Sequence, residues 1–213
     1  MHDDARSEQL ITGPAGLIEL IVDEPVLPVR GIAVVSHPQP LLGGSPHHVV
    51  PLTLARKLCA AGWRVVRPSF RGVGQTAGTH AEGVGEAEDS IVVVRHLQER
   101  YPELPIALVG FSFGAHVFAR VAVTLESSLH AVALLGLPVG EVPGGRFYPA
   151  LPLPSRCLLL HGEHDEMAPL ANLLDWARPE HRPVIVYSAA NHFFKGCLAQ
   201  VADQVVRHLN ERS

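Results

Sequence analysis

Short apolar stretches alternate with longer amphipathic stretches along most of the chain. The later apolar stretches are almost continuously apolar, as expected for strands that are covered on both faces. The pattern predicts strands at residues 17–22, 31–37, 63–69, 105–110, 131–136, 156–162 and 183–188. The stretches between them predict helices at residues 49–61, 84–101, 113–125, 169–178 and 194–211.

Regular alternation of strands and helices is typical of a mostly parallel sheet with helices on both faces. We therefore predict the α/β class and one domain over residues 1–213, a three-layer α/β/α sandwich. Residues 1–16 precede the first predicted strand, and we expect them to be poorly structured. Right-handed crossovers place the functional loops of such a sheet at the carboxyl ends of its strands.

Composition narrows the class of protein. Hydrophobic residues make up 47% of the 213 residues and charged residues 18%, which is enough apolar material for a sizeable core. The formal net charge of −4, without any run of Lys and Arg, disfavours a nucleic-acid-binding surface. A homodimer is left open.

No targeting or membrane segment is evident. The first ten residues lack the basic and apolar regions of a signal peptide, and no apolar stretch approaches the length of a membrane span. The three cysteines, Cys59, Cys157 and Cys197, are odd in number and widely spaced. We expect free thiols, with Cys157 buried in its strand, and a cytoplasmic protein.

Ser112 lies between Gly110 and Gly114, where the predicted strand 105–110 gives way to the predicted helix 113–125. Two glycines allow a strand to reverse sharply into a closely packed helix, as the G-x-S-x-G turn of a nucleophilic serine requires. The helix start then offers backbone N–H groups to developing negative charge. The alternative is a tight turn with an incidental serine.

Five segments in this order carry a wider resemblance: HPQPLLGG (37–44), FRGVGQTAG (70–78), GFSFGA (110–115), HGEHDEMAP (161–169) and NHFF (191–194). With them the chain resembles the α/β-hydrolase superfamily, and more narrowly its small, lidless, dienelactone-hydrolase-like serine branch. The resemblance spans residues 17–211 and implies a catalytic triad in the order serine, acid, histidine.

The family order points to Ser112, Asp165 and His192, since the last two each follow a predicted strand. His192 is expected to take the serine proton, and Asp165 to orient the imidazole. The alternatives for the acid are Glu163 and Glu166. Among the thirteen histidines, His37, His161 and His164 also lie near strand ends.

Acyl transfer also needs two N–H donors for the oxyanion. One is expected from Phe113, the residue after the serine. In the loop HPQP the two prolines have no N–H, so Gln39 is the best second donor and matches the family position, with His37 and Leu41 as alternatives.

Two other motifs give weaker evidence about function. The glycines of FRGVGQTAG do not have the spacing of a dinucleotide-binding site. Adjacent His47 and His48, with His37, do not have the spacing of metal ligands, so we expect neither a metal nor an organic cofactor.

The segment between residues 137 and 155 is too short for a cap domain. An open site is expected, with walls formed by Leu41, Leu42, Phe147 and Tyr148, although these side chains are equally suited to ordinary loop packing. The leading hypothesis is a serine hydrolase of short or medium acyl esters or lactones. The alternatives are amide or peptide cleavage or acyl transfer on the same triad, and a hydrolase-like binding protein without turnover.

Overall fold

The computed structural model describes residues 6–211. Its main sheet has eight strands in the order β1-β2-β4-β3-β5-β6-β9-β10, and all pairs from β4 to β10 are parallel. The strands of this sheet are β1 (Arg6–Gly13), β2 (Gly16–Asp23), β3 (Gly31–Val35), β4 (Trp63–Pro68), β5 (Ile106–Phe111), β6 (Ala131–Leu135), β9 (Cys157–Gly162) and β10 (Ile185–Tyr187).

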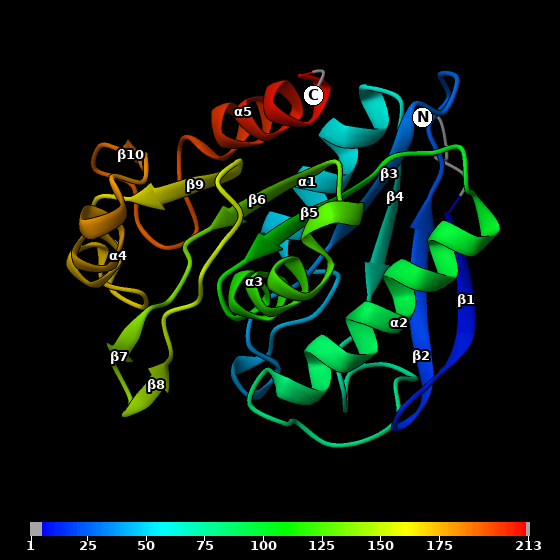
Figure 1. The fold of residues 1–213 in the computed structure, drawn as a ribbon, viewed down its shortest axis with the longest axis horizontal. Coiled ribbons are helices and arrows are strands. Elements are labelled where there is room, and N and C mark those ends of the chain that lie inside the picture. The colour runs from blue at the N-terminus through cyan, green and yellow to red at the C-terminus, as the bar shows by residue number, and fades with distance from the viewer. Residues whose placement is uncertain (1–5, 212–213) are drawn as a thin grey trace.

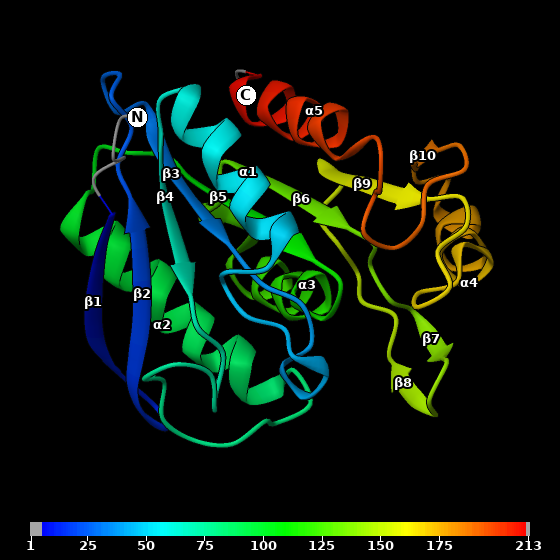
Figure 2. The same ribbon diagram turned by 180° about the vertical axis from the view of Figure 1, so that it is seen from behind.

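Helices cover both faces of the sheet (Figure 1 and Figure 2). One face carries α2 and α3, and the opposite face carries α1 and α5; each layer has its own apolar core cluster against the sheet. The α-helices are α1 (Val49–Ala60), α2 (Val84–Arg100), α3 (Phe113–Leu125), α4 (Leu170–Ala177) and α5 (Leu198–Asn210). The predicted three-layer sandwich is confirmed.

The burial of the central strands explains why the continuously apolar stretches of the sequence could be recognised as strands. Every residue of β3, β5 and β6 is buried, because parallel strands in the middle of the sheet are covered by helices on both faces.

Within the part of the chain that the structure describes, no helix is long and apolar enough to cross a membrane.

The expectation of a poorly structured segment over residues 1–16 is wrong for the part that is described. Residues 6–13 form β1, which pairs antiparallel with β2 across a two-residue turn at residues 14–15. The remainder, residues 1–5, lies outside the described range. Leu10 is exposed at this sheet edge, and β1 is held by backbone hydrogen bonds to β2. Hydrophobic periodicity gives little signal for a strand that is held in this way.

Two further differences concern the second half of the chain. A two-stranded hairpin of β7 (Gly140–Val142) and β8 (Arg146–Tyr148) occupies the segment expected to be a loop. The last helix begins at Leu198 and not at residue 194, because Phe194 has a φ of 54°, which an α-helix does not accommodate. Cys157, expected to be buried, is only partly buried, and Cys157 and Cys197 are free thiols.

Candidate active site

Ser112 occupies the turn between β5 and α3 in a strained backbone conformation. Its φ of 58° and ψ of −128° are rare for a residue with a side chain. A Cβ on Gly110 would lie 2.6 Å from the Cα of Ala115, and a Cβ on Gly114 would overlap the Ser36 hydroxyl. Strand, turn and helix therefore pack so closely that both flanking positions require glycine.

The hydroxyl of Ser112 meets His192, which comes from the loop after β10. Its Oγ lies 2.8 Å from His192 Nε2, and His192 Nδ1 lies 2.7 Å from Asp165 Oδ2. Because the carboxylate only accepts, Nδ1–H donates to Asp165 and Nε2 is left to accept the serine proton. The structure thus joins three residues that the sequence separates by 80 and 27 positions.

Asp165 lies in the loop after β9 and is held by that loop's own backbone. Its Oδ1 accepts hydrogen bonds from the N–H groups of Met167 (3.0 Å) and Ala168 (2.7 Å), while Oδ2 faces His192. His161, which is buried, donates from Nε2 to the Ala168 carbonyl at 2.7 Å. The carboxylate is therefore oriented through both oxygens, and His161 steadies the turn that presents it.

Among the competing histidines, His161 lies beside the acid, with its Nε2 3.4 Å from Asp165 Oδ2. The other competing side chains lie away from the triad. Glu163 is exposed and accepts the Ala189 N–H at 2.7 Å, and Glu166 and His164 are exposed as well. His37 is buried in the loop after β3. None of these side chains forms a hydrogen bond with Ser112 or His192 among residues 6–211.

His37 fixes the loop that contains Gln39. Its Nδ1–H donates to the Pro38 carbonyl (2.8 Å), and its Nε2 accepts the N–H of Phe70 (3.0 Å). Burial lowers the pKa of His37 to about 3, so the ring is neutral and can serve both partners at neutral pH. The Gln39 carbonyl in turn accepts from Leu42 and Gly44, which closes the loop.

The backbone N–H groups of Gln39 and Phe113 donate no hydrogen bond within the part of the chain that the structure describes. Gln39 lines the same pocket as Ser112, whereas His37 and Leu41 are not among the lining residues. Phe113 opens α3, where the first N–H groups of a helix have no intrahelical acceptor. The role of the Gln39 and Phe113 N–H groups as oxyanion donors stays a prediction.

Comparison with known proteins places this chain in a family. Residues 32–144, which are 113 of the 213 residues, match the family described as serine aminopeptidase, S33. An α/β serine hydrolase homologue from Coxiella burnetii is 33% identical, with 95% of this chain and 97% of that chain covered and a TM-score of 0.81. The chain belongs to this family of α/β serine hydrolases.

Two further solved structures are similar to the hydrolase. An α/β serine hydrolase without a lid from Xanthomonas campestris is 30% identical, with 96% of this chain and 93% of that chain covered and a TM-score of 0.84. An esterase from Pyrococcus furiosus is 15% identical, with 97% and 92% covered and a TM-score of 0.75. The last likeness shows the fold alone.

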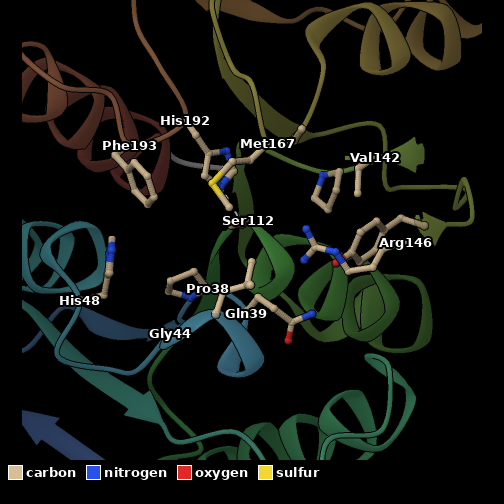
Figure 3. Close-up of a pocket in the computed structure, with 14 residues that line it drawn as sticks. Pro38, Gln39, Gly44, His48, Ser112, Val142, Arg146, Met167, His192 and Phe193 are labelled. Atoms are coloured by element: carbon tan, nitrogen blue, oxygen red, sulfur yellow. Dashed lines mark hydrogen bonds between the residues drawn. The ribbon is translucent and has the colours of Figure 1, made fainter. Parts of the chain in front are cut away.

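The hydrolase has a concave pocket over Ser112 of about 520 Å³, including its open mouth. Figure 3 shows Ser112 and His192 between two ends of this pocket, one with His48 and Phe193 and one with Val142 and Arg146. Burial and the neighbouring His192 lower the pKa of His48, so this end carries a neutral ring at neutral pH.

The expected apolar walls are divided between two hollows. Leu42 lines the pocket of Ser112, whereas Leu41 and Phe147 line a neighbouring hollow of about 750 Å³, including its open mouth. Tyr148 lies between the two and lines both. Sequence reasoning missed several lining residues, because only the folded hairpin and loops bring them to the serine. These are His48, Val142, Arg146, Met167 and Phe193.

In the described range 6–211, no group of three His, Cys, Asp or Glu side chains is arranged to hold a metal ion. The pocket of Ser112 carries neither Asp nor Glu among its lining residues. The chemistry that its own groups can support is nucleophilic attack by a hydroxyl with a histidine as proton acceptor.

Proposed function

We propose that the hydrolase cleaves carboxylic esters, short or medium acyl esters or lactones, through an acyl-enzyme on Ser112. The observation that carries this proposal is the continuous hydrogen-bonded series from Ser112 through His192 to Asp165. The open, lidless pocket and the esterase among the similar folds favour small ester substrates.

In the first half-reaction, Ser112 Oγ attacks the ester carbonyl while His192 Nε2 accepts the hydroxyl proton. Asp165 stabilises the resulting imidazolium, and the N–H groups of Gln39 and Phe113 bind the oxyanion of the tetrahedral intermediate. The intermediate collapses when His192 gives the proton to the departing alkoxide. Water, deprotonated by His192, then attacks the acyl-enzyme by the same route and regenerates Ser112.

The family description favours a second candidate, release of an amino-terminal residue from a peptide. Such an activity requires a partner for the free ammonium group of the substrate, usually a carboxylate. No Asp or Glu is among the residues that line the pocket of Ser112, and the pocket carries an arginine instead. Ester cleavage is therefore the better-supported function.

The decisive experiment is labelling of the purified protein with a fluorophosphonate probe, followed by peptide mass spectrometry. We expect one adduct on Ser112, a sharp loss of labelling in His192→Ala, and none in Ser112→Ala. The same three proteins are then assayed on nitrophenyl esters, lactones and aminoacyl anilides.

An adduct elsewhere, or equal labelling in His192→Ala, contradicts the proposed triad. Faster cleavage of aminoacyl anilides than of esters identifies the peptidase alternative. Folded protein that neither labels nor turns over any substrate favours the binding-protein hypothesis.

A further inference from the structure

Arg146, the first residue of β8, places a positive charge beside the serine. It is partly buried and lines both the pocket of Ser112 and the neighbouring hollow. Figure 3 shows its side chain reaching into the pocket opposite the end that holds His48. Its guanidinium donates a long hydrogen bond, 3.3 Å, to the carbonyl of Pro143 and also interacts with the Tyr148 phenol.

No carboxylate neutralises this guanidinium within the described part of the chain. Arg146 forms no ion pair there, whereas Arg64, Arg67 and Arg71 each pair with an acid. Glu82 lines the neighbouring hollow together with Arg146 but is not paired with it. A partly desolvated arginine without an acidic partner is a ready-made site for an anion.

Two further polar groups lie beside Arg146. Tyr148 is buried; burial raises the pKa of its phenol, so the hydroxyl is protonated at neutral pH, with Arg146 and Gln39 close enough to oppose that shift. The side-chain amide of Gln39 is also buried, and its Oε1 has no hydrogen-bond partner in the described residues. The guanidinium, the phenol and the amide all line the pocket of Ser112 and together give it a polar end. Figure 3 shows Arg146 and Gln39 at this end.

We infer that the substrate carries a carboxylate apart from its scissile ester, and that Arg146 binds this carboxylate while Ser112 attacks the ester. The inference rests on the proposed function and names its substrate class. Arg146 is the sole Lys or Arg among the residues that line the two hollows, so a singly charged group is matched better than a phosphate dianion.

The test compares two nitrophenyl esters of the same length, the half-ester of glutaric acid and the half-ester in which its free carboxylate is a primary amide. We expect the carboxylate to raise kcat/KM about tenfold in the wild type, mainly through KM, as charge-assisted hydrogen bonds do. Arg146→Gln is expected to remove this preference, so that the two esters are cleaved with equal kcat/KM. Arg146→Lys keeps part of it.

The matched control is Arg207→Gln, since Arg207 is exposed on α5 and contacts Gln204. This variant should keep the full preference. Equal rates for the two esters in the wild type, or a preference that survives in Arg146→Gln, overturns the inference while ester cleavage itself stands. Lack of cleavage of both esters overturns the proposed function first.

Binding to Ser112→Ala separates the two failures, because it needs no turnover. Calorimetry with glutarate should show binding that is lost when Arg146→Gln is added. Inorganic phosphate should bind more weakly than glutarate. Phosphate binding tighter than glutarate contradicts the assignment of a carboxylate.

Discussion

The loop that holds Gln39 and the hairpin that holds Arg146 both line the pocket of Ser112, but they are attached to the fold differently. The loop after β3 is held by a fully buried ring, His37, and closed by its own backbone hydrogen bonds. The hairpin lies outside the main sheet as two three-residue strands. Asn172 anchors its start by bonds to the Val139 and Glu141 carbonyls.

The difference follows from what each element has to do. Groups that stabilise a transition state must be held in place before the reaction, which requires a rigid setting. A wall that contacts the rest of the substrate tolerates exposed and variable side chains, such as Phe147, which is 70% exposed. We therefore expect substitutions on the serine side to lower kcat, and substitutions on the hairpin to change KM.

The largest effect is expected at Asp165, on the rigid side. In Asp165→Asn the amide oxygen can still accept from Met167 and Ala168, but its NH₂ then faces His192 and imposes the wrong tautomer. We expect kcat to fall by about four orders of magnitude with little change in KM.

Steady-state kinetics with a nitrophenyl ester measures this loss, and Glu163→Gln is the matched control in the same loop. A loss of tenfold or less in Asp165→Asn would transfer the role to Glu163 or Glu166.

The second effect tests the loop of Gln39 directly. Gln39 has a φ of −53°, close to the value that proline adopts, so Gln39→Pro removes the N–H with little change of backbone. Loss of one oxyanion donor is expected to lower kcat by about 10²- to 10³-fold. Gln39→Ala keeps the N–H and should retain most of the kcat on neutral esters. Equal losses in the two variants would rule out the backbone donor.

The third effect is a pH dependence of stability that arises from buried histidines. The pKa of His37 is lowered to about 3 and that of His116 to about 4, in both cases chiefly by burial. The unfolded chain binds protons first, near pH 6.5, so stability is complete above that pH and is lost as the pH falls toward the folded-state values. Lowering the pH from 7.5 to 5 is therefore expected to reduce the unfolding free energy by ~2 kcal/mol for each of these two histidines.

Urea unfolding at the two pH values checks the sign and the size. His37→Gln should be less stable at pH 7.5 but should lose ~2 kcal/mol less than the wild type on acidification. An unchanged pH dependence in this variant would show that His37 is not kept neutral by the fold.

The smallest effect is expected on the hairpin. Phe147→Ser removes an exposed ring from the hollow beside the pocket, so we expect a change of a few-fold in KM for apolar acyl esters and unchanged kcat. The unfolding free energy should stay within ~0.5 kcal/mol of the wild type. Val26→Ser, at another exposed apolar side chain, is the control. A fall in kcat would mean that the hairpin also positions the reacting groups.

Much of the sandwich and the glycine-flanked serine could be named from the sequence, because their signals are local. Buried parallel strands such as β5 are continuously apolar, and the turn around Ser112 needs its two glycines for steric reasons. The edge strand β1 and the hairpin of β7 and β8 have no such signal. They are short or half-exposed, and pairing with a neighbouring strand decides their structure.

The sequence by itself determined the alternation of strands and helices, the glycine-flanked serine and the order of the residues that follow it. The tertiary structure alone decided which carboxylate and which imidazole meet that serine, since Asp165 and His192 converge only when β9 and β10 join the same sheet edge. It also decided that Arg146 lies beside the serine without an acidic partner among residues 6–211. Hydrophobic periodicity records local burial, whereas contacts between distant loops depend on how the whole sheet is assembled.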